Sequence, residues 1–288
     1  MLATKWFLKP TSLLRSLKTN KITITFMSKI SPLAFVHPNA ILGKNVVIDA
    51  FAYIDDNVEI GDKTVIMPNA TVLSGARIGS ECTIFPHATI SAIPQDLKFI
   101  GEDTITKIGD RTMVRECATV NRGTASRGAT IIGSDCLLMA YSHVAHDSVL
   151  KNFVILGNTT QLAGEVEIDD YAILSGGTLV HQFTRIGAHT MIQGGSKVPK
   201  DIPPYTMVGR EPLTYVGLNF VGLRRRGFKS EVINSIQDIY RYLYQSGLNT
   251  TQAIEKIILE LPDSPEKEYV VSFIKNSTRG IIRGNMEG

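Results

Sequence analysis

The sequence predicts an all-β left-handed parallel β-helix of hexapeptide repeats, followed by a small C-terminal α-helical domain. Two periodic patterns and one change of period support this prediction. Every sixth residue from Val36 to Val198 is Val, Ile or Leu at 25 of 28 positions. The residue two before each of these is Ala, Cys, Ser, Thr or Val at 26 of 28 positions. After residue 230 the apolar residues recur instead with a helical period.

The two six-residue patterns describe short strands around a common core. Residues i and i−2 of a strand point to the same face, so each repeat supplies one large and one small inward side chain. Three such repeats, joined at tight corners, close one triangular coil, and Gly43, Gly61 and Gly79 recur once per coil. Coils about 4.8 Å apart give a prism of about nine coils, roughly 40–45 Å long. We expect residues 30–202 to form it.

Residues 1–29 precede the repeat and are expected to be an N-terminal extension. Segment 1–26 contains five basic residues and no acidic residue. That composition resembles an organelle transit peptide. The alternative is an upstream in-frame start, with Met27 as the functional one, because the repeat begins shortly after it.

Two interruptions break the repeat. The aliphatic position is occupied by Asp96 and Glu102 in one of them and by Ser126 in the other. Charged side chains cannot point into an aliphatic core, so we expect segment 91–107 to loop out of the prism. The second interruption covers 121–131. Loops on solenoids often carry function.

The repeat ends at Pro199, and residues 203–288 are expected to form the helical domain. An apolar stripe with helical spacing predicts a helix from about 230 to 247. Two shorter helices are expected at 250–261 and 265–278, the second with a proline as its first residue.

Composition excludes several classes of protein. Hydrophobic residues make up 43% and charged residues 20%, which is typical of a globular protein. No apolar run is long enough for a transmembrane helix, and a net charge of +3 does not indicate nucleic-acid binding. Three cysteines without C-x-x-C spacing indicate a reducing compartment. Cys82 and Cys136 fall in the small inward register and are expected in the core.

Three of the six histidines cluster in segment 143–181 and are predicted to face outward. His146 lies two residues past an inward aliphatic, in a register that is otherwise solvent-facing, and Asp147 follows it. Imidazole titrates near neutral pH, so His143 and His146 suit general base catalysis. Solvated surface histidines are an equally open interpretation. A metal site with His181 would need ligands converging from adjacent coils or subunits. The other three histidines have no companions and are interpreted as ordinary: His37, His87 and His189.

One dense basic run, Gly222–Gly227, holds three consecutive arginines. Arginine suits bidentate phosphate binding, so a phosphorylated ligand is one interpretation. A solvated basic turn at the start of a helix is the other. Because no aromatic stacking platform accompanies the run, a small polyphosphate molecule fits better than nucleic acid.

Five motifs together resemble the acyl-ACP–UDP-N-acetylglucosamine O-acyltransferase family, which begins lipid A synthesis in Gram-negative bacteria. The resemblance runs from about Ile30 to Arg283, and the motifs follow the family's order and spacing. They are the segments Ala92–Phe99, Asn121–Thr124, His143–Asp147, Val180–Phe183 and Gly222–Phe228.

The resemblance implies a cytoplasmic homotrimer without metal or cofactor. It would move a β-hydroxyacyl chain from acyl carrier protein to the 3-hydroxyl of UDP-N-acetylglucosamine. His146 matches the family's general base. Asp147 is expected to orient it, although strand alternation would turn the two apart unless they lie at a corner. The Gly164 amide neighbours the oxyanion position, where a fixed donor stabilises a tetrahedral intermediate.

The resemblance also implies substrate contacts. The sugar- and phosphate-proximal positions match Asp96, Lys98, His143 and His181. The nucleotide-side positions match Gln182, Asn219, Arg225 and Arg226. Gly194 stands where family members set acyl length, and glycine leaves room for a long chain. Glu165 departs from the family, because the best-known members carry histidine there. Lys197, Lys200 and the arginine run are candidates for contact with the acidic carrier protein.

Three other functions fit less well. The zinc carbonic anhydrase of the same architecture resembles this chain in fold, but it needs a histidine pair five residues apart, whereas His143 and His146 are three apart. The sister N-acyltransferase carries a uridine-binding domain before its repeats, and only about 35 residues precede Val36 here. A non-catalytic scaffold explains neither the looped interruption nor the His146–Asp147 pair.

Overall fold

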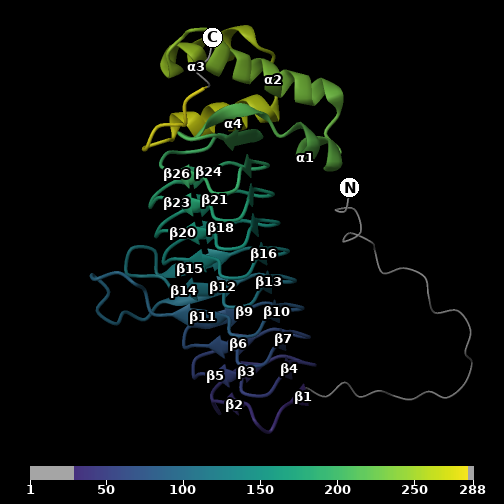
Figure 1. The fold of residues 1–288 in the computed structure, drawn as a ribbon, viewed down its shortest axis with the longest axis vertical. Helices are drawn as coiled ribbons and strands as arrows, with labels where there is room; N and C mark the ends of the chain where they lie inside the picture. Colours follow the sequence, from purple (N-terminus) through teal and green to yellow (C-terminus); the bar gives the residue numbers. More distant parts are fainter. Residues whose placement is uncertain (1–28, 285–288) are drawn as a thin grey trace, which may run out of the picture.

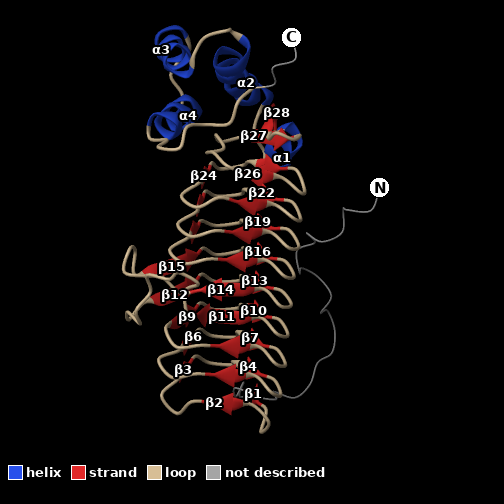
Figure 2. Cartoon of the chain, turned by 60° about the vertical axis from the view of Figure 1, so that its left-hand side comes forward, coloured by secondary structure: helices blue, strands red, loops and turns tan. Residues whose placement is uncertain are grey.

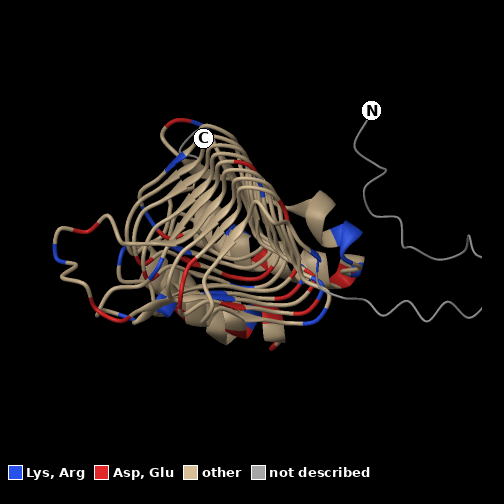
Figure 3. Cartoon of the chain, turned by 90° about the horizontal axis from the view of Figure 1, so that it is seen from below, with Lys and Arg blue, Asp and Glu red and all other residues tan. Residues whose placement is uncertain are grey.

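The structure is a computed structural model that describes residues 29–284. The prediction for the N-terminal extension therefore falls almost entirely outside the described residues. The chain winds as the predicted left-handed parallel β-helix, with helices stacked on its C-terminal end (Figures 1 and 2). Seen along its axis, the prism is triangular (Figure 3). The predicted β-helix and C-terminal helices are confirmed.

Three sheets form the faces of the prism, and most strands are only two residues long. Within the described residues, the nine-stranded sheet consists of β2 (Phe35–Val36), β5 (Tyr53–Ile54), β8 (Thr71–Val72), β11 (Thr89–Ala92), β14 (Thr119–Asn121), β17 (His143–Val144), β20 (Gln161–Leu162), β23 (Leu179–Val180) and β26 (Lys197–Val198). The eight-stranded sheet consists of β3 (Ile41–Leu42), β6 (Glu59–Ile60), β9 (Ala76–Ile78), β12 (Ile105–Ile108), β15 (Ala129–Ile132), β18 (Val149–Leu150), β21 (Glu167–Ile168) and β24 (Arg185–Ile186). The eleven-stranded sheet consists of β1 (Lys29–Ile30), β4 (Val47–Ile48), β7 (Val65–Ile66), β10 (Thr83–Ile84), β13 (Met113–Val114), β16 (Leu137–Leu138), β19 (Ile155–Leu156), β22 (Ile173–Leu174), β25 (Met191–Ile192), β27 (Thr206–Gly209) and β28 (Thr214–Leu218).

The core is the pair of ladders that the repeat predicts. Large aliphatic side chains such as Ile84 and Leu138 are fully buried, whereas Val36, in the first turns, is half-buried. The small ladder includes Cys82 and Cys136, each 1% exposed. Burial raises the pKa of the Cys136 thiol to about 11. Both cysteines are confirmed as core residues.

The corners are tight because most of them contain one residue with a left-handed backbone conformation. Asp147, Glu165 and Phe183 have φ of 59°, 58° and 64° and occupy the same corner in successive coils. Asparagine and aspartate tolerate this conformation best. A corner placement, rather than strand alternation, thus sets the direction of Asp147.

Both predicted interruptions leave the prism as loops. The segment 93–104 connects β11 to β12, and the segment 122–128 connects β14 to β15. The two loops project from one side of the prism (Figure 1). They leave from the same edge, where the nine-stranded sheet meets the eight-stranded sheet.

Two elements of the C-terminal region were not predicted. The eleven-stranded sheet continues past residue 202, because β27 pairs in parallel with β25 and then antiparallel with β28. A short helix, α1 (Phe220–Arg225), contains much of the basic run, and Asn219 caps its N-terminus. A helix this short cannot show a helical period in the sequence.

The three predicted helices are present as α2 (Ser230–Gln245), α3 (Thr250–Glu260) and α4 (Pro265–Lys275). The last helix ends earlier than predicted, at the Asn276 cap. Tyr269 fastens α4 to the prism, because its hydroxyl donates to Asp169 at 2.5 Å and accepts from the Ala188 amide at 2.9 Å. No helix between residues 29 and 284 is long and apolar enough to cross a membrane.

Candidate active site

Several predicted site residues lie along one edge of the prism, which we call the loop edge. It is the corner between the nine-stranded and eight-stranded sheets, and the two loops leave from it. His146, Gly164 and Gln182 succeed one another on it, one in each of three consecutive coils. The period of the coil therefore brings together residues that are distant in the sequence.

His146 is buried rather than solvent-facing as predicted, with only 8% of the residue exposed. The register prediction was wrong because it considered the prism alone. Gly164 in the next coil and Asp96 of the loop 93–104 cover the outward-pointing ring. The ring is thus held on the outer surface of the coil but beneath other parts of the chain.

Asp147 fixes the orientation of the imidazole. Its Oδ2 lies 2.8 Å from His146 Nδ1, and the residue is fully buried. The carboxylate also accepts hydrogen bonds from the Thr124 amide at 3.0 Å and the Thr124 hydroxyl at 2.6 Å. A carboxylate accepts hydrogen bonds, so Nδ1 donates to it and the neutral ring keeps its free lone pair on Nε2.

Gly164 is required where it packs against the ring. A Cβ on this residue would lie 2.6 Å from both Cε1 and Nε2 of His146. Its amide donates no hydrogen bond to any residue in the described part of the chain. An unpartnered N–H on a residue that packs against the imidazole can stabilise an oxyanion that forms near it.

Asp96 and Lys98 lie on the loop 93–104, as predicted. Asp96 Oδ2 is 3.7 Å from His146 Nε2, which is too long for a direct hydrogen bond. Asp96 Oδ1 accepts from the Lys98 amide at 2.9 Å, which shapes the turn. Lys98 itself is exposed. The loop thus places a carboxylate opposite the free face of the imidazole.

His143 lies on the outer face of β17, half-buried and one strand position before the loop edge. Its Nδ1 is 2.7 Å from the Thr119 hydroxyl on the neighbouring strand β14. Burial, with a smaller contribution from the neighbouring His146, lowers the pKa of His143. The ring is therefore neutral near pH 7 and can offer a hydrogen bond without charge.

His181 and Gln182 lie on the loop edge two coils further along. His181 is exposed, as predicted, and its Nδ1 lies 3.0 Å from the Gln182 carbonyl oxygen. That hydrogen bond leaves Nε2 of His181 free to contact a ligand. Among residues 29–284, no three His, Cys, Asp or Glu side chains gather closely enough to hold a metal ion.

Three of the four predicted nucleotide-side residues lie near a second edge, where the eight-stranded and eleven-stranded sheets meet, whereas Gln182 lies on the loop edge. The Asn219 side chain donates to the His189 carbonyl at 2.9 Å. Arg226 donates to the Tyr171 carbonyl at 3.1 Å, and its guanidinium lies 5.1 Å from the Tyr171 ring. Arg225 is exposed at the end of α1. We call this corner the arginine edge.

His189 on the arginine edge is not an ordinary surface histidine. Its ring stacks between Tyr171, at 4.9 Å, and Tyr205, at 5.6 Å. Burial, and then the charge of Arg226, lower its pKa to about 4. Sequence reasoning missed this column because its members come from three successive coils and are far apart in the sequence.

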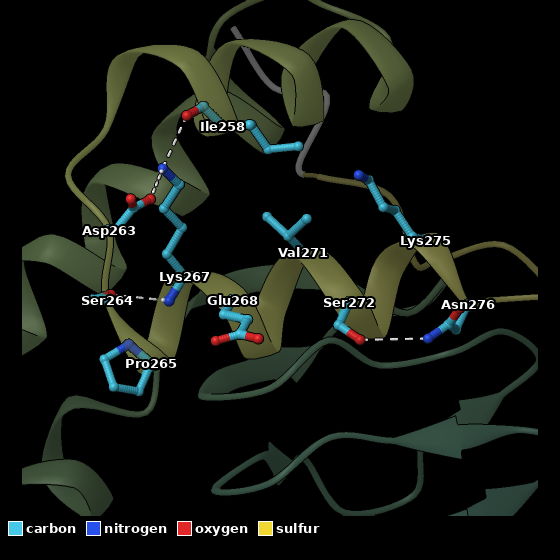
Figure 4. A pocket seen from close by; sticks show the side chains of 10 residues that line it. All are labelled: Ile258, Asp263, Ser264, Pro265, Lys267, Glu268, Val271, Ser272, Lys275 and Asn276. Carbon is cyan, nitrogen blue, oxygen red and sulfur yellow. Dashed lines mark hydrogen bonds and ion pairs between the residues drawn. The ribbon is translucent and has the colours of Figure 1, made fainter.

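Gly194 lies on the third edge, after β25 and before β26, and is exposed. One chain therefore distributes the predicted site over three edges and does not gather it in one place. A cavity of about 770 Å³ lies beside α4 and the end of α3 (Figure 4), but none of the predicted site residues lines it. His146 itself lies on an edge of the prism.

Sequence reasoning also assigned no role to three residues that support the histidines. Thr124 and Arg127, both in the loop 122–128, donate to Asp147, and Thr119 holds His143. The interruption at 121–131 was the available signal for the first two. The contacts of Thr124 and Arg127 with Asp147 could not be predicted from the spacing of residues in the sequence.

Comparisons with known proteins agree with the geometry. Residues 201–282 match the family model described as UDP-N-acetylglucosamine O-acyltransferase, domain 2, and residues 57–92 match that of the bacterial transferase hexapeptide. The acyl-[acyl-carrier-protein]–UDP-N-acetylglucosamine O-acyltransferase of Pseudomonas syringae pv. syringae is 48% identical over 258 residues, covering 89% of this chain and all of that protein.

Solved structures of UDP-N-acetylglucosamine acyltransferases also resemble this chain. The UDP-N-acetylglucosamine acyltransferase of Bacteroides fragilis is 56% identical with a TM-score of 0.86, covering 88% of this chain and 99% of that one. The Francisella novicida enzyme is 39% identical with a TM-score of 0.87, covering 89% and 95%. The chain belongs to the acyl-[acyl-carrier-protein]–UDP-N-acetylglucosamine O-acyltransferase family.

Proposed function

We propose that the protein transfers a β-hydroxyacyl chain from acyl carrier protein to the 3-hydroxyl of UDP-N-acetylglucosamine, the first step of lipid A biosynthesis, with His146 as general base. The observation that carries the proposal is the buried Asp147–His146 pair, whose Nε2 lies 3.7 Å from Asp96 Oδ2 and packs against Gly164. The family relationship supports the substrates and the reaction class.

The geometry supports a direct transfer without a covalent enzyme intermediate. His146 Nε2 takes the proton of the sugar hydroxyl as that oxygen attacks the thioester carbonyl. The Gly164 amide donates to the developing oxyanion, and Asp147 stabilises the imidazolium that forms. When the tetrahedral intermediate collapses, the C–S bond breaks and the imidazolium returns its proton to the carrier thiolate.

The substrate positions follow from the edges. Asp96 and Lys98 on the loop 93–104, together with His143 and His181 near the loop edge, would hold the sugar and its phosphate. Gln182, Asn219, Arg225 and Arg226 would hold the nucleotide. Because His146 and Arg226 lie at opposite edges of the eight-stranded sheet, the proposal places the arginine edge of a second subunit against the loop edge of the first. This supports a homotrimer with sites between subunits.

A complementation experiment tests the shared site. Subunits carrying His146→Ala are mixed with subunits carrying Arg226→Ala under conditions that exchange subunits. Sites that take His146 from one parent and Arg226 from the other should recover activity, up to about a quarter of the wild-type value per site if mixing is random. Each variant alone should stay inactive. No recovery in mixed trimers, verified by mass, would mean that each site uses one chain only.

Donor choice and location complete the proposal. The enzyme would act in the cytoplasm, where acyl carrier protein is available, and Lys197, Lys200 and the arginine run would attract that acidic partner. Gly194 leaves space for a long acyl chain, so Gly194→Met should shift the preference to a shorter donor. A series of carrier proteins loaded with hydroxyacyl chains of increasing length, assayed by mass spectrometry of the product, measures this.

A further inference from the structure

The loop 122–128 lies directly over Asp147. The Thr124 amide and hydroxyl donate to the carboxylate, and the Arg127 amide donates to its Oδ1 at 3.2 Å. Asp147 has no exposed surface. The loop is therefore what separates this carboxylate from water, and it also supplies most of its hydrogen bonds.

The side chain of Arg127 ties this loop to the next coil. Its Nη2 lies 2.7 Å from Glu167 Oε1, and its Nε lies 3.8 Å from Glu165 Oε2. Glu165 occupies the same corner as Asp147 in the next coil, so it stands above Asp147 on the loop edge. Arg185 holds the other oxygen of Glu167 at 3.4 Å. Arg127 thus contacts Asp147 through its backbone amide and the next coil through its guanidinium.

Glu165 is the second carboxylate that contacts Arg127. Its carboxylate faces Arg127, and its side chain is only 19% exposed. The Glu165 amide donates to the His146 carbonyl at 3.0 Å, so its backbone is fixed as well. The ion-pair contact of this side chain is therefore with the loop.

We propose that Arg127, held by Glu165 and Glu167, is a positioning residue that closes the loop 122–128 over Asp147 and so aligns the Asp147–His146 pair. The inference rests on the proposed function, in which His146 is the base. If the loop opens, water replaces the Thr124 and Arg127 donors, and the carboxylate no longer has one fixed direction. The imidazole then loses its alignment toward the sugar hydroxyl.

The expected effect falls on turnover. Arg127 and its partners are partly exposed, and such ion pairs add little to folding stability. Arg127→Ala should therefore fold normally. Misplacing a catalytic group by a fraction of an ångström costs about tenfold or more in rate. We expect kcat to fall about tenfold, with the KM for UDP-N-acetylglucosamine changed by less than about twofold.

Three comparisons separate positioning from a general structural role. Arg127→Lys keeps the charge and should restore part of kcat. Glu165→Gln should lower kcat in the wild type but add nothing in the Arg127→Ala background. Arg77→Ala is the matched control, because Arg77 pairs with Glu59 at 3.1 Å on the same sheet, four strands away from Glu167. It should leave kcat unchanged.

Hydrogen exchange of the loop supplies a readout that does not depend on activity. In Arg127→Ala, peptides spanning 122–128 should take up deuterium faster, whereas the Arg77→Ala protein should match the wild type. Wild-type exchange in Arg127→Ala would overturn the proposal, as would wild-type kcat. A raised KM with unchanged kcat in Glu165→Gln would overturn it in favour of a sugar contact. An inactive wild-type enzyme would instead refute the proposed function, and the exchange result would still decide the loop.

Discussion

Replacing Gly164 by alanine should displace the His146 imidazole, the proposed general base, without unfolding the protein. The added Cβ would lie 2.6 Å from His146 Cε1 and Nε2, whereas ordinary contact begins near 3.4 Å. The ring must therefore move by about 0.8 Å or the backbone must yield. Gly164 has no left-handed φ, so alanine meets no backbone penalty there. The variant also keeps the amide N–H, so the proposed oxyanion donor remains.

A misplacement of this size is expected to lower kcat about 100-fold, with little change in either KM. The assay is steady-state acyl transfer from hydroxyacyl-acyl carrier protein, with thermal unfolding measured on the same samples. The same substitution in a His146→Ala protein should cause no further loss, because the ring it displaces is absent. Activity above half of the wild-type value, in a folded Gly164→Ala protein, would refute the inferred contact between glycine and base.

Further predictions concern stability and reactivity. His189→Phe keeps the aromatic stack and should make the protein less sensitive to acid. The folded protein keeps His189 neutral down to a pKa of about 4, whereas the unfolded imidazole titrates near 6.5, so unfolding takes up a proton and stability falls as pH drops through that range. The full pKa shift corresponds to about 3 kcal/mol of unfolding free energy, which solvent screening of a partly exposed ring reduces to about 1–2 kcal/mol. Urea unfolding of both proteins at pH 7 and pH 5 measures how much stability each loses. Equal losses in the wild type and in His189→Phe would contradict the prediction. Tyr269→Phe removes two hydrogen bonds between α4 and the prism and should cost about 1–3 kcal/mol of unfolding free energy; an unchanged melting temperature would argue against that contact. Burial raises the pKa of Cys82 and Cys136, so both thiols should react slowly with an alkylating reagent. At pH 8 the reagent should modify at most Cys117 in the native protein and all three thiols after denaturation. Fast labelling of Cys136 in the native protein would show that the core opens.

The repeat made the prism predictable because each coil repeats the same physical problem. One large and one small inward residue every six positions, as at Ile84 and Cys82, suffice to define strand, face and register. The interruptions were equally clear, since Asp96 could not enter an aliphatic core. The hairpin of β27 and β28 and the short helix α1 were missed. These elements lack the six-residue period, and they are too short to show a different periodic pattern in the sequence.

The site was predictable in composition but not in environment. The register placed His146 on the outer side of the coil, yet it could not show that Gly164 and Asp96 cover the ring. The resemblance supplied roles for His146 and Asp147, and the corner geometry explains how adjacent residues meet. The contacts of Thr124 and Arg127 depend on how the loop 122–128 folds back, which no local pattern encodes.

Turnover by His146→Ala is the measurement that tests the account most directly. The wild-type protein should convert UDP-N-acetylglucosamine and hydroxyacyl-acyl carrier protein to the 3-O-acylated sugar nucleotide. His146→Ala should lower kcat by about 10²–10⁴-fold, the usual contribution of a general base, while its circular dichroism and assembled mass stay those of the wild type. A correctly assembled His146→Ala protein with near wild-type turnover would contradict the assignment of His146 as the base.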